Sequence, residues 1–273
     1  YPVNIYAKDF DNNGSLDALM SLYLKDQHGN KKEFPVSARD NVMAQLPLLN
    51  KKFPSYKSFA AADIHDIFSD ADLNNAVHLQ ANNFASCYIE NLGKGKFKVH
   101  PLPAPAQFAP VFAMIADDFN SDGNLDVLLC GNDFGNEPTN GRYDAMNGLV
   151  LLGNGKGGFT PETMMQSGIC IDGNAKALVK LRGTGNHYLV AASENQGPLQ
   201  LYTLNNTSIK TIGLDPNDKT IYIHLRNGAT RKEEVYHGNS FLSQSSLFIQ
   251  VNNSMKSITI INNKMESRTV NFK

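Results

Sequence analysis

The chain has 273 residues, with 25 Lys and Arg against 26 Asp and Glu, so its formal net charge is −1. This balance excludes recognition of nucleic acid or of an anionic membrane by bulk charge. Hydrophobic residues make up 41% and charged residues 19%, which is typical of a folded globular protein. No apolar run approaches the roughly 20 residues that span a bilayer, so no transmembrane segment is expected.

Short apolar runs separated by turns rich in Gly, Asn and Asp dominate the chain, and this pattern predicts β-strands. In chain order the predicted strands are 3–8, 18–24, 86–90, 111–117, 127–130, 148–152, 177–181, 188–192, 199–204, 209–213, 220–225, 247–251, 257–261 and 269–272. The chain opens directly in the first of these strands. We therefore expect a fragment of a longer protein or a mature form whose leader has been removed.

Residues at about 40–80 break the strand pattern. Apolar residues recur there at helical spacing, first at Val42, Leu46, Leu49 and Phe53, and then at Ala60, Ile64, Ile67 and Phe68. Pro47 ends or kinks the first helical segment, and Pro54 separates the two segments. The sequence thus predicts a helical insertion in an otherwise β protein.

Two nine-residue segments repeat each other. Residues 9–17 read DFDNNGSLD and residues 118–126 read DFNSDGNLD, and each copy lies between two apolar strands. A second repeated element is a Gly-rich hairpin closed by an aromatic residue, at 91–97 and again at 152–159. Strand, acidic loop, strand and later hairpin is the order expected in one unit of a β-propeller.

The repeated loops have the composition of a calcium site. Oxygen-bearing side chains occupy positions 1, 3, 5 and 9, which are Asp9, Asp11, Asn13 and Asp17 in the first loop and Asp118, Asn120, Asp122 and Asp126 in the second. A Gly at position 6 permits a sharp turn, and the backbone carbonyl at position 7, from Ser15 or Asn124, supplies a further oxygen. Neither loop contains Cys or His, so the ligand set favours Ca²⁺ over a transition metal.

Two other structures are less consistent with the loop sequences than a calcium site. An EF-hand requires a Glu at position 12 between two helices, but position 12 is Met20 or Leu129 within a predicted strand. Asp, Asn and Gly also form ordinary turns without an ion. Two copies in the same strand–loop–strand context favour metal binding over simple turns. Asp117, beside the second loop, is expected to be solvated and not to be a ligand.

These loops resemble the D-x-D-x-D-G-x-x-D calcium loops of FG-GAP/VCBS repeats, which build integrin-like β-propellers. The hairpin at 151–159 resembles the N-G-x-G-x-F segment of those repeats, and residues 234–246 are similar to the Ser-Gln-Ser signature of the ASPIC/UnbV domain. The resemblance implies a mainly β fold, with partial or remodelled β-propeller-type blades at 1–205, including the helical insertion, and a small β domain at 206–273.

The chain departs from the family pattern in three ways. Asn13 and Asn120 replace Asp, which is expected to weaken calcium binding. A third unit at 180–190 lacks carboxylates in its loop and is expected to be metal-free. Finally, the repeats are too few for a closed propeller, which has about four to eight blades.

The resemblance implies a non-catalytic module that is stabilised by calcium and contacts a protein or a glycan, in a secreted, periplasmic or outer-surface protein. No catalytic residue is predicted. The long polar loop at 131–144 is the expected recognition surface, with Arg142, Tyr143 and Asp144 as contact residues. Two alternatives stay open: a calcium-assisted enzyme acting on polysaccharide, and a purely structural segment of a larger protein.

Overall fold

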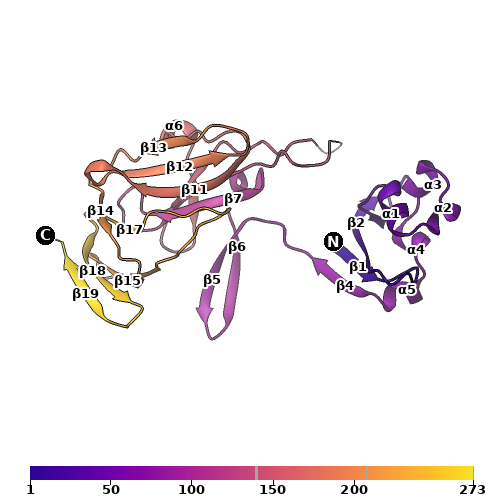
Figure 1. The fold of residues 1–273 in the computed structure, drawn as a ribbon, viewed down its shortest axis with the longest axis horizontal. Helices are drawn as coiled ribbons and strands as arrows, with labels where there is room; N and C mark the ends of the chain where they lie inside the picture. The colour runs from indigo at the N-terminus through magenta and orange to yellow at the C-terminus, as the bar shows by residue number, and fades with distance from the viewer. Residues whose placement is uncertain (139–140, 207, 273) are drawn as a thin grey trace. The chain divides into compact units, whose positions relative to one another are not determined.

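The computed structural model describes residues 1–138, 141–206 and 208–272. The fold is mainly β, with 43% strand and 13% helix, and its sheets are antiparallel. The chain divides into two compact units, Tyr1–Phe84 and Ala85–Lys273. Figure 1 shows the elements of each unit.

The first unit combines one sheet with five short helices. The sheet has the order β3-β2-β1-β4, from β1 (Val3–Lys8), β2 (Asp17–Lys25), β3 (Lys31–Pro35) and β4 (Val77–Ala81). The helices are α1 (Arg39–Gln45), α2 (Leu49–Lys52), α3 (Tyr56–Ala60), α4 (Ile64–Ile67) and α5 (Asp70–Asn74). They occupy the segment in which the apolar spacing predicts a helical insertion.

The sequence keeps these helices short. Pro47 lies between α1 and α2, and Pro54 lies between α2 and α3. Ser55, Asp63 and Ser69 each accept a backbone N–H at the start of α3, α4 and α5. Such caps satisfy N–H groups that have no partner inside the helix.

The helices and the sheet share one core. Its buried members include Tyr6, Leu19, Val42, Leu46, Phe59, Ile64 and Leu73. A buried carboxylate also lies in this unit: Asn4 Nδ2 donates to Glu33 Oε1 at 2.6 Å, and Ser21 Oγ donates to the same oxygen. Because Glu33 is hydrogen-bonded, the charged strand β3 can form part of the sheet.

Within its described residues, 85–138, 141–206 and 208–272, the second unit contains five sheets. β7 (Val111–Asp117), β8 (Asp126–Gly131), β9 (Leu149–Gly153) and β10 (Phe159–Pro161) form a four-stranded meander. Two sheets have two strands each: β5 (Cys87–Gly93) pairs with β6 (Lys96–Pro101), and β14 (Lys210–Gly213) pairs with β17 (Phe248–Val251). A three-stranded sheet contains β11 (Ala175–Arg182), β12 (Tyr188–Glu194) and β13 (Gln200–Thr203). A four-stranded sheet contains β15 (Asp218–Leu225), β16 (Thr230–Glu234), β18 (Met255–Asn262) and β19 (Ser267–Asn271). Its short helices are η1 (Ala104–Gln107), α6 (Met164–Ser167) and η2 (Thr184–Asn186).

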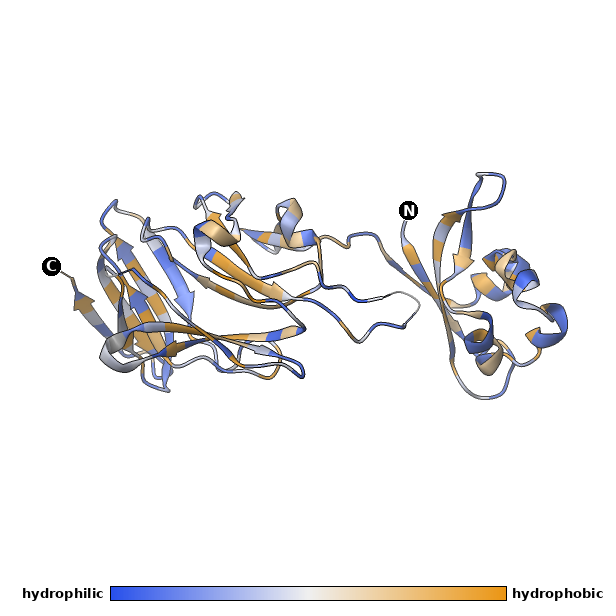
Figure 2. Ribbon diagram, turned by 90° about the horizontal axis from the view of Figure 1, so that it is seen from above, coloured by the Kyte–Doolittle hydropathy of each residue, from blue (hydrophilic) through white to orange (hydrophobic). Residues whose placement is uncertain are grey.

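Three apolar clusters support the second unit. The first joins β7 and β8 to β11 and β12, the second lies among β15, β17 and β18, and the third lies under β8 and β9. Figure 2 shows hydrophobic residues concentrated along the strands of both units. The domain boundary predicted between 205 and 206 falls inside this unit and stays a prediction.

Among the described residues the sheets form no closed barrel or propeller, so the predicted propeller-type blades stay a prediction. In the same residues, no helix has the length and apolar character needed to cross a membrane.

Candidate metal centres

The two repeated loops occupy the same structural position. Residues 9–17 connect β1 to β2, and residues 118–126 connect β7 to β8. In both hairpins the residue before the loop pairs with the last residue of the loop, as Lys8 with Asp17 and Asp117 with Asp126. Each acidic loop is therefore held at its two ends by the same antiparallel register.

The loop backbones also agree. Positions 4 and 6 have positive φ in both copies, 57° at Asn12 and 87° at Gly14, and 66° at Ser121 and 92° at Gly123. Two left-handed residues separated by one other residue curl the chain into a tight loop. The Gly predicted at position 6 is thus in the conformation for which a side chain is unfavourable.

Backbone N–H groups fix the carboxylates of the first loop. Asp9 Oδ1 accepts from Asn13 N at 3.0 Å, and Asp9 Oδ2 accepts from Gly14 N at 2.8 Å. Asp17 Oδ2 accepts from Phe10 N at 3.0 Å. The first and last carboxylates of the loop are thus oriented by the loop's own backbone.

The second loop repeats these bonds atom for atom. Asp118 Oδ1 accepts from Asp122 N at 3.1 Å, and Asp118 Oδ2 accepts from Gly123 N at 2.9 Å. Asp126 Oδ2 accepts from Phe119 N at 2.9 Å. The two loops therefore share one conformation, and this conformation comes from the nine-residue pattern common to both.

Position 5 holds position 7 in the same way in both loops. Asn13 Oδ1 accepts from Ser15 N at 2.7 Å, and Asp122 Oδ1 accepts from Asn124 N at 2.7 Å. The predicted carbonyl ligands from Ser15 and Asn124 thus lie in a turn that is closed by a side chain of the same loop.

The first loop brings three carboxylates together. One oxygen from each of Asp9, Asp11 and Asp17 lies within 4.8 Å of the others. Asp17 is buried, whereas the other two are partly exposed. Three negative charges this close repel one another unless a cation lies between them. The oxygen-only ligand set fits a hard divalent ion such as Ca²⁺.

In the described part of the chain, the second loop forms no comparable group of three carboxylates. Position 3 is Asn120, whose Nδ2 donates to Asp122 Oδ2 at 3.3 Å, so an amide replaces a carboxylate there. Asp118, Asp122 and Asp126 therefore do not converge as closely as the three carboxylates of the first loop, and their role as ligands stays a prediction.

C-terminal residues enclose the second loop. Asn252 Nδ2 donates to Asp118 Oδ2 at 2.7 Å, and Gln250 Nε2 donates to the Asp118 carbonyl. Arg231 Nη1 donates to the Gly123 carbonyl at 2.9 Å. Asp118 is fully buried as a result.

Burial changes the electrostatics of the second loop. It raises the pKa of Asp118 above its ordinary value, and it raises the pKa of Asp126 to about 6, although Gly153 N and Phe119 N both donate to this carboxylate. A bound cation would favour the ionised form of both groups.

The loop predicted to carry recognition is partly a β-bridge. Asp133 and Tyr143 exchange both backbone hydrogen bonds, at 2.8 and 2.9 Å. The Arg142 guanidinium lies 4.7 Å from the centre of the Phe134 ring. Arg142, Tyr143 and Asp144 are all exposed, and residues 139 and 140 lie outside the described residues. The contact role of these residues stays a prediction.

The expectation that Asp117 is solvated is wrong. Asp117 is buried, and its Oδ2 accepts from Lys180 Nζ at 3.0 Å and from the Tyr188 hydroxyl at 3.2 Å. Burial, together with the Asp117 charge, raises the pKa of Tyr188 well above its ordinary value. The sequence signal for this cluster is weak, because its partners are separated by more than 60 residues.

No family model matches the chain, and a search of the curated proteins finds no match. The resemblance to FG-GAP/VCBS repeats and to the ASPIC/UnbV domain therefore depends on the motif residues alone.

Proposed function

We propose that the chain is a calcium-stabilised, non-catalytic binding or assembly module of a secreted, periplasmic or cell-surface protein. The observation that carries this proposal is the shared conformation of the two acidic loops, which have the same hydrogen-bond pattern and the same two positive-φ positions. Such agreement over nine residues is more than ordinary turn formation requires.

In the first loop, Asp9, Asp11 and Asp17 would hold the ion with their carboxylates, and Asn13 and Ser15 would add neutral oxygens. The backbone N–H groups of Asn13 and Gly14 orient the Asp9 carboxylate. The ion would supply positive charge, and the chain would supply a preformed ring of oxygens. Its role is to hold the hairpin between β1 and β2, which supports binding elsewhere on the molecule.

The second loop would act in the same way with Asp118, Asn120, Asp122, Asn124 and Asp126. We further propose that the meander β7-β8-β9-β10 is a propeller-type blade, and that residues 206–273 form an ASPIC/UnbV-like domain. Modest calcium affinity, about 10⁻⁴–10⁻³ M, is typical of extracellular modules. The partner would be a protein or a glycan, with Arg142, Tyr143 and Asp144 in contact.

Thermal unfolding in EDTA and then in excess calcium tests this proposal. Calcium at about 10–100 times its Kd is expected to stabilise the fold by about 1.4–2.7 kcal/mol. Asp11→Ala should remove most of the heat of calcium binding contributed by the first loop in calorimetry.

Asp70→Ala is the matched control, because it removes one carboxylate from the first unit at a side chain that is 83% exposed. It should leave the calcium response intact. A wild-type melting temperature that does not change at millimolar calcium would contradict the proposal.

A further inference from the structure

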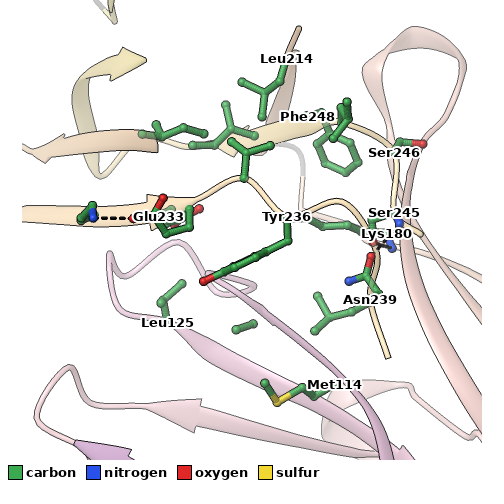
Figure 3. A pocket seen from close by; sticks show the side chains of 18 residues that line it. Met114, Leu125, Lys180, Leu214, Glu233, Tyr236, Asn239, Ser245, Ser246 and Phe248 are labelled. Carbon is green, nitrogen blue, oxygen red and sulfur yellow. Dashed lines mark hydrogen bonds and ion pairs between the residues drawn. The ribbon is translucent and has the colours of Figure 1, made fainter. Parts of the chain in front are cut away.

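A cavity of about 390 Å³ lies within the second unit (Figure 3). Its walls come from β7, β11, β16 and β17 and from the segment 236–246 that follows β16. Its volume is in the range of sites that hold a small organic ligand, about 300–1,000 Å³. Neither acidic loop's ligand set lines this cavity.

Three ion pairs bring opposite charges to the wall of the cavity, and one of them joins Lys232 and Glu234, which both line it. Lys180 Nζ lies 3.0 Å from Asp117 Oδ2, and Arg231 Nη2 lies 3.0 Å from Glu233 Oε1. Lys180 and Glu233 both line the cavity. Since each charge is neutralised by its own partner, the wall has no net charge to attract an ion.

The same wall retains unused hydrogen-bonding capacity. Among the described residues, Asp117 is the one acceptor for the Lys180 ammonium, which has three N–H groups. Both contacts of Glu233 with Arg231 use Oε1, and no described residue donates to Oε2. A donor and an acceptor therefore remain for a ligand.

The Ser-Gln segment positions a second donor. Ser245 N donates to Asn239 Oδ1 at 2.7 Å, so the Asn239 amide is held with its nitrogen toward the cavity (Figure 3). Ser245 Oγ accepts from Lys180 N at 3.0 Å, which ties this segment to β11. Ser245, within the motif at 243–246, is thus hydrogen-bonded to both Asn239 and Lys180 and holds them at the cavity.

Apolar groups form the rest of the cavity. Phe248, Leu125 and Met114 line it, and the Tyr236 ring extends across the view in Figure 3. Tyr236 is 74% exposed, so its ring is available for stacking. A flat aromatic face next to a few fixed polar groups suits a ligand with both an apolar face and polar substituents.

These features select the ligand chemistry. A lone anion would meet Glu233, and a lone cation would meet Lys180. An apolar protein side chain would leave the spare N–H of Lys180 and the spare oxygen of Glu233 unpaired, at a cost of about 1–3 kcal/mol each. A neutral ring that carries several hydroxyl groups satisfies both, because each hydroxyl donates and accepts.

We propose that this cavity binds a neutral sugar residue of a glycan, with Tyr236 stacked on the ring and with Lys180, Glu233 and Asn239 bonded to its hydroxyl groups. The proposal rests on the binding function proposed above; it assigns one ligand class to that function and adds a site that is separate from Arg142, Tyr143 and Asp144.

Saturation-transfer NMR with the full chain and a panel of neutral disaccharides tests the proposal, and calorimetry then gives Kd for those that bind. Tyr236→Ala and Glu233→Gln are each expected to weaken binding at least tenfold. Phe108→Ala is the matched control, because Phe108 is a 60% exposed aromatic residue of the same unit and does not line the cavity. It should bind as the wild type does.

No transfer to any disaccharide of the panel would overturn the proposal, as would binding that Tyr236→Ala and Glu233→Gln leave unchanged. Binding of an apolar peptide that the disaccharides fail to displace, and that Tyr236→Ala abolishes, would also overturn it in favour of protein docking.

The calcium response of each variant separates this proposal from the one on which it rests. Loss of sugar binding with an intact calcium-dependent melting shift in Tyr236→Ala supports a distinct sugar site. A wild type that binds sugar but shows no calcium shift would contradict only the metal role.

Discussion

The two acidic loops have the same conformation in opposite surroundings. The first is largely exposed, and its three carboxylates converge within 4.8 Å. The second is enclosed by Arg231, Gln250 and Asn252, which bond to Asp118 and Gly123. The nine-residue pattern thus determines the shape of the loop, whereas distant residues determine what stabilises it. We expect calcium removal to destabilise the first loop more than the second, because protein contacts also hold the second loop.

The largest expected loss of stability follows from replacing the Asp at position 1 of the second loop. Asp118→Ala removes the acceptor for Asp122 N, Gly123 N and Asn252 Nδ2, and it leaves donors unpaired in a buried site. We expect a loss of about 3–5 kcal/mol in the free energy of unfolding. Asp9→Ala, at the exposed copy, should cost about 1 kcal/mol. Urea unfolding of both variants in EDTA measures the difference, and equal costs would contradict the comparison.

A smaller effect is expected when the enclosing side chain is removed instead. Asn252→Ala deletes the bond to Asp118 and also the acceptor for Ser254 N and Ser254 Oγ. The expected cost is about 1–3 kcal/mol. The neighbouring Asn253→Ala is the control, because Asn253 is exposed. If Asn252→Ala were as stable as this control, the contact of Asn252 with Asp118 would contribute nothing to the free energy of unfolding.

The smallest expected loss of stability concerns a carboxylate outside both loops, Asp218, which serves as a reference for the two loop carboxylates. Arg268 donates to both oxygens of Asp218, with Nη1 at 2.6 Å from Oδ1, and this pair lowers the pKa of Asp218 below its ordinary value. Since the folded-state pKa is the lower one, the pair stabilises the fold above the unfolded-state pKa of about 3.9. This stabilisation is lost as the pH falls through the folded-state pKa.

Asp218→Asn should therefore lose about 1–2 kcal/mol near neutral pH and should show a shallower decline in stability toward acid. Denaturant unfolding at a series of pH values, with EDTA throughout, measures both slopes. A variant that declines as steeply as the wild type would show that other groups control the acid response.

Sequence patterns located most strands because these carry apolar runs. Two strands that the patterns do not predict, β3 and β4, differ in their reasons. β3 is mostly charged, and it joins the sheet because Asn4 and Ser21 satisfy Glu33. β4 is exposed along its whole length, pairs with β1 at separations of 70 to 78 residues, and lies in the segment of about 40–80 that was predicted to be helical. Its apolar and polar residues alternate, but over only five residues, and the helical spacing before it favours a helix.

In the candidate metal centres too, the local conformation could be predicted from the sequence and the long-range contacts could not. Local spacing predicted the positions of Gly14 and Gly123, and both have the positive φ that the curl requires. The enclosure of the second loop could not be predicted, because it depends on Gln250 and Asn252, which follow Asp118 by 132 and 134 residues. The burial of Asp117 leaves no local signal for the same reason, because its partners come from β11 and β12.

The same separation has a consequence for synthesis on the ribosome. The hydrogen bonds from Gln250 and Asn252 to Asp118 span 132 and 134 residues, so the nascent chain cannot complete them until its last strands emerge. At a synthesis rate of about 5–20 residues per second, Gln250 and Asn252 are made about 7–27 seconds after Asp118. The tip of the hairpin of β7 and β8 therefore stays uncovered until the C-terminal strands fold onto it, so Asp118 acquires its buried environment late in synthesis.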